Sequence, residues 1–239
     1  MSGGAYIVTG GSRGIGAGVV AGLSARGDHA VAVGRDEERL MALHTEHGAS
    51  PLLADLTSKE GWDAVVGFVA DKGFRVRGVI HSAGVVHPAS LENEASDDVS
   101  RQMLLNLQAP MELTRRLVPH FVQGAHVVML SSTLAHRPAP GRAAYAATKA
   151  GIEGYVRAAA LELGPRGVSV NGIAPGVVDT DMIRDAVGHD EKALDGLRGL
   201  HRLGRLGTPE DIWLAVEYLL NSEFVTGTVI TVDGGLCLG

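Results

Sequence analysis

The chain has 239 residues, of which 45% are hydrophobic and 20% are charged; such values are typical of a globular protein with a sizeable core and exclude disordered and fibrous chains. Its 21 basic and 27 acidic side chains give a formal net charge of −6, so the protein as a whole does not attract nucleic acid or an anionic membrane. We expect a single domain over residues 1–239, because α/β folds of this length commonly form one unit.

Short β-branched runs alternate along the chain with longer segments in which apolar residues recur every three or four positions. This alternation predicts a doubly wound α/β fold, with a parallel sheet of seven strands and helices on both faces. Strands are expected at Ala5–Thr9, Ala30–Gly34, Pro51–Ala54, Gly78–His81, His126–Leu130, Ser169–Ala174 and Thr228–Val232. Helices are expected at Ile15–Arg26, Asp36–His47, Glu60–Asp71, Asp97–Phe121, Ala143–Leu163 and Glu210–Leu220.

One long stretch, residues 176–207, has no clear periodicity. A long irregular segment inside a compact domain is more often a lid or a binding loop than a disordered region. We therefore expect residues 176–207 to form a substrate lid.

A glycine-rich turn follows the first predicted strand and opens the first helix. It reads Thr9-Gly10-Gly11-Ser12-Arg13-Gly14-Ile15-Gly16. Small residues allow a pyrophosphate to approach the helix N-terminus, where free N–H groups and the helix dipole favour negative charge. Tight packing alone is the other interpretation of such glycines, but the order of strand, turn and helix favours a dinucleotide site. No Gly-Lys-Ser/Thr follows, which excludes a Walker-type site.

The residues after the second strand bear on the choice between NAD and NADP. A free 2′-hydroxyl usually meets an acidic side chain here, whereas a 2′-phosphate requires an arginine. Arg35 follows the strand directly, and Arg13 of the glycine turn can reach the same phosphate. Asp36 is the competing candidate for a 2′-hydroxyl, but it precedes a helix and is well placed as its N-cap. The sequence therefore favours NADP(H) over NAD(H).

A serine, a tyrosine and a lysine form the candidate catalytic group. Ser132 ends the fifth strand, and Tyr145 and Lys149 share a face of the following helix because they are four residues apart. The ammonium of Lys149 is expected to lower the pKa of Tyr145 and make it an acid/base, while Ser132 hydrogen-bonds the substrate oxygen. Taken singly, each residue also has a structural interpretation, as a core residue, a surface charge or a cap.

With these residues the sequence resembles the short-chain dehydrogenase/reductase family, most closely its single-domain members of the β-ketoacyl-(acyl carrier protein) reductase type. The resemblance covers the whole chain and implies a Rossmann fold. It rests on the turn Thr9–Gly16, which matches TGxxxGxG, and on the order and spacing of Ser132, Tyr145 and Lys149. The segments Pro175–Met182 and Val232–Gly235 also match the family.

The resemblance implies roles for further residues. Asn106 would hold a water in a proton relay, and Lys149 would also bind the nicotinamide ribose. One departure is visible: His81-Ser82-Ala83-Gly84 stands where the family usually has Asn-Asn-Ala-Gly, and His81 is expected to be a packed strand-end residue. The cofactor-binding residues so implied are Gly10, Ser12, Arg13, Gly14, Ile15, Gly16, Arg35, Asp55, Leu56, Ala83, Gly84, Tyr145, Lys149, Pro175, Gly176, Val178 and Thr180.

The function predicted is an NADP(H)-dependent oxidoreductase that interconverts a ketone and a secondary alcohol. An NAD-dependent alcohol or diol dehydrogenase and a non-catalytic dinucleotide-binding protein are the alternatives. His136 and Arg142, between Ser132 and Tyr145, are the candidate substrate contacts. The resemblance also implies a homotetramer, formed through the predicted helices Asp97–Phe121 and Ala143–Leu163 and through the C-terminal strand region.

Cysteine and histidine usage gives the remaining expectations. Cys237 is the single cysteine and can form neither an internal disulfide nor a cysteine-based zinc site, as in a reducing compartment. His44 and His47 have no third ligand nearby, so no metal site is predicted. No apolar run approaches the roughly 18 residues of a membrane span, and the N-terminus lacks a secretory signal. We expect a cytoplasmic protein that binds neither nucleic acid nor membranes.

Overall fold

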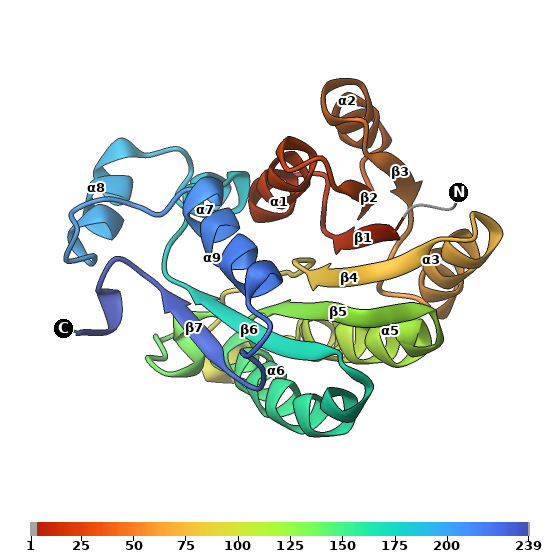
Figure 1. Cartoon of the computed structure of the whole chain (residues 1–239). Coiled ribbons are helices and arrows are strands. Elements are labelled where there is room, and N and C mark those ends of the chain that lie inside the picture. Colours follow the sequence, from red (N-terminus) through yellow and green to blue (C-terminus); the bar gives the residue numbers. More distant parts are fainter. Residues whose placement is uncertain (1–3, 239) are drawn as a thin grey trace.

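A seven-stranded sheet forms the centre of the computed structural model, which describes residues 4–238 (Figure 1). Each strand pairs parallel with its neighbours, in the order β3-β2-β1-β4-β5-β6-β7. The predicted doubly wound α/β fold is therefore confirmed. The strands are β1 (Gly4–Thr9), β2 (His29–Gly34), β3 (Ser50–Leu53), β4 (Arg75–His81), β5 (Phe121–Leu130), β6 (Ser169–Pro175) and β7 (Val229–Val232).

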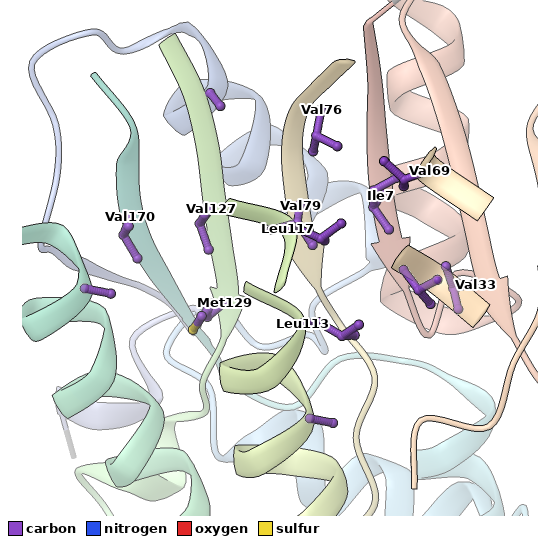
Figure 2. Close-up of a cluster of buried hydrophobic side chains, with 14 of the residues drawn as sticks. Ile7, Val33, Val69, Val76, Val79, Leu113, Leu117, Val127, Met129 and Val170 are labelled. Atoms are coloured by element: carbon purple, nitrogen blue, oxygen red, sulfur yellow. The ribbon is translucent and has the colours of Figure 1, made fainter. Parts of the chain in front are cut away.

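Helices cover both faces of the sheet, because successive side chains of a strand point to opposite faces. Tyr6 and Val8 of β1 pack with α1, α2 and α9, whereas Ile7 packs with α3, α5 and α6. Figure 2 shows Ile7 beside Val69 of α3 in this second cluster. Full burial of one Val, Leu or Ile side chain contributes about 1.5–3 kcal/mol. The helices are α1 (Gly14–Ala25), α2 (Glu37–His47), α3 (Lys59–Asp71), α5 (Ala109–Leu117), α6 (Ala143–Leu163) and α9 (Pro209–Asn221).

Side-chain caps fix where several of these helices begin. As predicted, Asp36 is the N-cap of α2, and its carboxylate accepts a hydrogen bond from the backbone N–H of Arg39 (3.1 Å). Ser58 caps α3 in the same way. Thr208 and Asp211 form a reciprocal capping box at the start of α9. Each cap contributes about 1 kcal/mol.

The single helix predicted over Asp97–Phe121 is wrong. The structure has α4 (Ser96–Met103), then a π-helical turn over Leu104–Gln108, then α5. Pro110 lacks the N–H that would bond the carbonyl of Asn106 four residues earlier, and the N–H of Ala109 reaches back five residues to Leu104. A 3-10 turn at Val118–His120 follows α5, and β5 then starts at Phe121, five residues before the predicted His126.

The segment expected to be irregular, residues 176–207, contains helices α7 (Asp181–Ala186) and α8 (Glu191–Gly199). Figure 1 shows them together at one end of the molecule, near the end of the chain. Periodicity of apolar residues is hard to detect here, because α7 has 6 residues and spans fewer than two turns. Further 3-10 turns occupy Leu91–Asn93, Thr133–Ala135, Gly164–Arg166 and Leu236–Leu238.

The strand order determines where a ligand can bind. From β1 the chain runs outward through β2 and β3, and it then returns to β4 on the other side of β1. At such a reversal the loops at the carboxyl ends of the two strands separate and leave a crevice.

Within residues 4–238, the structure contains no helix that is long and apolar enough to cross a membrane.

Candidate active site

A cleft of about 440 Å³ opens at the carboxyl edge of the sheet, where the strand order reverses. The loops after β1, β2, β3 and β4 form most of its wall, and the start of α7 closes one side. The structure brings together here most of the residues predicted to bind the cofactor. Those that line the cleft are Gly10, Ser12, Arg13, Gly14, Ile15, Arg35, Asp55, Leu56, Ala83, Gly84 and Thr180.

Steric contacts show why the turn after β1 requires glycine. A Cβ atom on Gly16 would lie 2.1 Å from the carbonyl oxygen of Gly10. Gly10 and Gly14 have positive φ values of 64° and 55°, a conformation that costs other residues energy. A Cβ on Gly10 would also lie 2.8 Å from the backbone of Ala83. Gly16 does not line the cleft; it permits the turn that does.

The N-terminus of α1 faces this cleft through Gly14 and Ile15. Its N-cap, Arg13, makes no side-chain capping bond, and the first turn has no acidic residue. Backbone N–H groups at the start of a helix favour an anion, and the helix dipole adds to this preference. The glycine turn and the helix N-terminus therefore fit the pyrophosphate of a dinucleotide.

Arginine and aspartate side chains line the cleft next to β2 and β3. The Arg35 guanidinium lies 3.7 Å from the Asp55 carboxylate, and both side chains are about half exposed (53% and 47%). Burial raises the pKa of Asp55, but hydrogen bonds from Thr57 and the charge of Arg35 bring it below its usual value. Asp36 also lines the cleft, although it caps α2 and pairs with Arg39 at 3.3 Å.

Ser132 and Tyr145 meet where β5 and α6 approach each other. The Ser132 hydroxyl accepts a hydrogen bond from the backbone N–H of Leu134 (3.1 Å). Burial raises the pKa of Tyr145 to about 12, while a hydrogen bond with Ser132 and the charge of Arg142 act in the opposite direction. The expectation that Lys149 gives Tyr145 a lowered pKa is therefore wrong for this structure, because burial is the larger effect.

Lys149 is buried beside Tyr145. Its ammonium nitrogen lies 5.5 Å from the centre of the Tyr145 ring and donates a hydrogen bond to the carbonyl oxygen of Leu130 (2.7 Å). Burial lowers the pKa of Lys149 to about 8. A Cβ on Gly84 would lie 3.7 Å from this nitrogen. Because Gly84 lines the cleft, the candidate catalytic group borders the place predicted for the cofactor.

Asn106 fixes the loop that follows β4. Its side chain accepts a hydrogen bond from the N–H of Val85 and donates one to the carbonyl of Val85, both at 2.8 Å. It also approaches Thr148 of α6 at 3.3 Å.

His81, at the end of β4, is buried and forms a hydrogen bond with the Thr114 hydroxyl (2.9 Å). The expectation that His81 is a packed strand-end residue is confirmed.

Several other predicted residues lie away from the cleft. Val178 is buried and forms a β-bridge with Gly207. Pro175 ends β6, and Gly176 lines a second, smaller cavity of about 110 Å³ together with His201 and Asp233. A Cβ on Gly176 would lie 3.1 Å from the Nε2 atom of His201.

The two candidate substrate contacts border the catalytic group. Arg142 is the N-cap residue of α6, and its charge acts on Tyr145. His136 follows the 3-10 turn Thr133–Ala135, and its Nε2 atom lies 2.9 Å from the carboxylate of Glu153.

Sequence reasoning missed two features of this region. Glu153 is buried on α6, and its spacing of four from Lys149 and eight from Tyr145 was the available signal, since such residues share a helix face. Asp181 lines the cleft and pairs with Arg39 of α2 at 2.6 Å. No signal in the sequence links these two residues, which are 142 positions apart.

Within residues 4–238, no cluster of three or more histidine, cysteine or acidic side chains is placed to hold a metal.

Known proteins resemble this chain over almost its whole length. The family described as enoyl-(acyl carrier protein) reductase matches residues 10–237. Carbonyl reductase family member 4 of Xenopus laevis is 34% identical over 235 residues, covering 97% of each chain. The 3-oxoacyl-(acyl carrier protein) reductase of Chlamydia muridarum is 33% identical, covering 97% of this chain and 96% of that protein. A solved variant of a Serratia marcescens short-chain dehydrogenase/reductase superposes with a TM-score of 0.90 at 31% identity, covering 98% and 97% of the two chains.

Proposed function

The chain belongs to the short-chain dehydrogenase/reductase family, and we propose that it is an NADP(H)-dependent oxidoreductase that interconverts a ketone and a secondary alcohol. The observation that carries the proposal is the position of Lys149, which lies next to Gly84 of the cleft lining and beside Tyr145, the hydrogen-bond partner of Ser132. A tyrosine that is hydrogen-bonded to a serine, with a buried ammonium nearby, is a plausible proton donor. Relatives named as carbonyl and 3-oxoacyl reductases support the same reaction class.

The cofactor pyrophosphate would bind at the glycine turn and the N-terminus of α1. Asp55 and Leu56 would contact the adenine, and Ala83 and Gly84 the ribose beside it; all four line the cleft. Lys149 would hold the nicotinamide ribose. Pro175, Gly176, Val178 and Thr180 would contact the nicotinamide end; of these four residues, Thr180 lines the cleft.

Arg35 supports NADP(H) over NAD(H). Its guanidinium is half exposed, lines the cleft and lies 3.7 Å from the carboxylate of Asp55, a long contact that leaves it available to a 2′-phosphate. Asp36, which would favour a 2′-hydroxyl, is already engaged as the N-cap of α2. Arg13 also lines the cleft and adds positive charge near the same position.

The protein residues position the substrate and move the proton. A nicotinamide held by Lys149 and Thr180 would supply the hydride chemistry, to the carbonyl carbon in reduction or from the alcohol in oxidation. In reduction, Tyr145 donates its phenolic proton to the carbonyl oxygen; a pKa raised to about 12 keeps that proton bound at neutral pH. Ser132 donates a hydrogen bond to the same oxygen, and the Lys149 ammonium stabilises the phenolate that forms. Asn106 holds the loop that carries Gly84, and it would hold a water through which the proton is replaced.

The substrate would enter between the loop after β5 and the lid, residues 176–207. Arg142 and His136, which border Tyr145 and Ser132, are the proposed substrate contacts. Thr180, Asp181 and Met182 already line the cleft from the lid side, which supports a role for this segment in covering the bound ligands.

We also propose that the protein forms a homotetramer and works in the cytoplasm. Exposed apolar side chains on the helices predicted to meet partner subunits support the assembly: Met103 on α4, Met111 on α5 and Leu161 on α6, the last 80% exposed. Light scattering should give about four times the 24.8 kDa of one chain; a particle of one chain mass would contradict the tetramer. The single cysteine, Cys237, cannot form a disulfide within the chain, as is typical of proteins in a reducing compartment, and this supports the cytoplasmic location.

A binding titration tests the function proposed. Nicotinamide fluorescence is followed while the wild-type protein and the variant Arg35→Ala are titrated with NADPH and with NADH. We expect wild type to bind NADPH more tightly, and Arg35→Ala to lose affinity for NADPH but not for NADH. A preference for NADH would favour the NAD-dependent dehydrogenase, and the absence of binding to both would contradict the proposal.

A further inference from the structure

Glu153 is a buried carboxylate on α6, only 5% exposed, that the proposed mechanism does not use. Its Oε1 atom accepts a hydrogen bond from the hydroxyl of Ser131 (2.8 Å). The same oxygen lies 2.9 Å from the Nε2 atom of His136. Because a carboxylate only accepts hydrogen bonds, the His136 Nε2 atom must carry a hydrogen.

Ser131 and His136 lie on the two sides of Ser132. Between them the chain forms the 3-10 turn Thr133–Ala135, closed by hydrogen bonds from the N–H of Ala135 to the carbonyl of Ser132 and from the N–H of His136 to the carbonyl of Thr133, both 3.0 Å. The Ser132 hydroxyl receives its own hydrogen bond from Leu134 inside this turn. One oxygen of Glu153 therefore holds both ends of the segment that orients Ser132.

We infer that Glu153 is a positioning residue for the proposed ketone reduction, and that through Ser131 and His136 it holds the Ser132 hydroxyl where it can meet the substrate oxygen. This inference rests on the proposed function for its catalytic consequence. The helix that carries Glu153 also carries Tyr145 and Lys149. The contacts of Glu153 with Ser131 and His136, called the clamp below, therefore fix Ser132 relative to Tyr145 and Lys149.

Stability alone does not account for a carboxylate at this position. Glu153 lies between Ile152 and Val156, which both belong to the hydrophobic core. A buried charge loses its hydration, and an apolar residue of similar volume often stabilises a protein as well or better. His136, whose side chain is 49% exposed, supplies the partner that offsets this cost. The Glu153–His136 pair is therefore explained better by the orientation that it gives to the turn after Ser132 than by its contribution to the stability of the protein.

Steady-state kinetics of Glu153 variants test the inference. In Glu153→Ala both contacts are lost, and we expect kcat for a reduced ketone to fall by about 10- to 100-fold, the effect of misplacing a reacting group by about 1 Å. In Glu153→Gln the amide oxygen still accepts the Ser131 hydrogen bond, so kcat should lie between those of wild type and Glu153→Ala. The Kd for NADPH should stay at the wild-type value, because Glu153 lies outside the cleft lining.

A matched control is His47→Gln, which removes a histidine from an exposed His–Glu pair on α2 (3.8 Å). It should leave kcat unchanged. An unchanged kcat in Glu153→Ala, or an equal loss of kcat and of NADPH affinity, would overturn the clamp. If wild type itself reduces no ketone, the proposed function fails instead, and the clamp is then decided by the unfolding measurement below.

Unfolding by urea provides the readout that does not depend on activity. His136→Ala leaves Glu153 as a buried carboxylate without its partner, which is costly. The second substitution Glu153→Gln removes that charge, so the double variant should be more resistant to urea than His136→Ala alone. Strictly additive effects of the two substitutions would show that Glu153 and His136 are not coupled and would overturn the inference.

Discussion

The guanidinium of Arg39 on α2 lies 2.6 Å from the carboxylate of Asp181 on α7. Asp181 lines the cleft from the lid side, and Asp36, which also pairs with Arg39, lines it from the β2 side. The three side chains therefore join the two sides of the candidate cofactor site. Arg39 and Asp181 are both nearly half exposed, so the pair adds little to overall stability but holds the start of α7, in the proposed lid, next to α2.

Asp181→Asn is expected to loosen the lid without unfolding the protein. The substitution removes the charge that Arg39 contacts, so bound NADPH should dissociate faster, by no more than about 5-fold because the pair is exposed to solvent. Stopped-flow displacement of fluorescent NADPH measures this rate. The control is Asp185→Asn on the same helix, which affects a pair with His189 in the turn after α7. Equal dissociation rates in wild type and Asp181→Asn would contradict the prediction.

Two glycine substitutions should act in opposite directions. Gly16→Ala places a Cβ 2.1 Å from the Gly10 carbonyl, so we expect a loss of stability of about 1–3 kcal/mol and weaker NADPH binding. Gly67, in α3, has no atom within 4 Å of its added Cβ. Gly67→Ala should stabilise the helix by about 0.5–1 kcal/mol. Urea unfolding measures both; a destabilised Gly67→Ala or a neutral Gly16→Ala would contradict the packing described.

His81 should make the protein sensitive to acid. Burial lowers its pKa from 6.5 to about 3, so between these values the unfolded chain binds a proton that the folded chain does not. The free energy of unfolding therefore falls as the pH is lowered, by up to about 1.4 kcal/mol per pH unit.

The variant His81→Asn lacks the titrating ring, so its stability should change less between pH 6.5 and 4. Urea unfolding at several pH values gives the two slopes, with the exposed His189→Asn as the control. If His81→Asn lost stability with acid as steeply as wild type, the burial assigned to His81 would be wrong.

The pH dependence of ketone reduction should reflect Lys149. Its pKa is lowered to about 8 by burial, so the ammonium loses its proton above this pH, and the developing phenolate of Tyr145 loses its stabilising charge. We expect kcat to fall as the pH rises above about 8. Lys149→Arg keeps a positive charge across this range and should lack this decrease, whatever its absolute rate. A wild-type kcat that stays constant up to pH 10 would contradict this role.

Features that depend on neighbouring residues were predicted well from the sequence. The order of strand, glycine turn and helix located the cleft, because the main reasons for its glycines are local: Gly10 and Gly14 have positive φ values, and a Cβ on Gly16 would meet the carbonyl oxygen of Gly10. The N-cap role of Asp36 is local in the same way and is confirmed. The alternation of short β-branched runs located all seven strands, although it missed the first five residues of β5.

Features set by distant contacts were not predictable. The Arg39–Asp181 pair joins residues 142 positions apart. The pKa of Tyr145 depends on how deeply α6 is buried, which a spacing of four residues does not show. The π-helical turn at Asn106 was missed although Pro110 was visible, because the pattern of apolar residues continues across it.

The variant Tyr145→Phe tests the central claim most directly. Its rate of NADPH oxidation with a panel of ketones is compared with that of wild type, and NADPH binding is followed by fluorescence in both. We predict that turnover falls by at least about 100-fold, because the proton donor is gone, while the Kd for NADPH stays close to the wild-type value. Turnover near the wild-type rate in Tyr145→Phe would contradict the assignment of Tyr145 and the mechanism built on it.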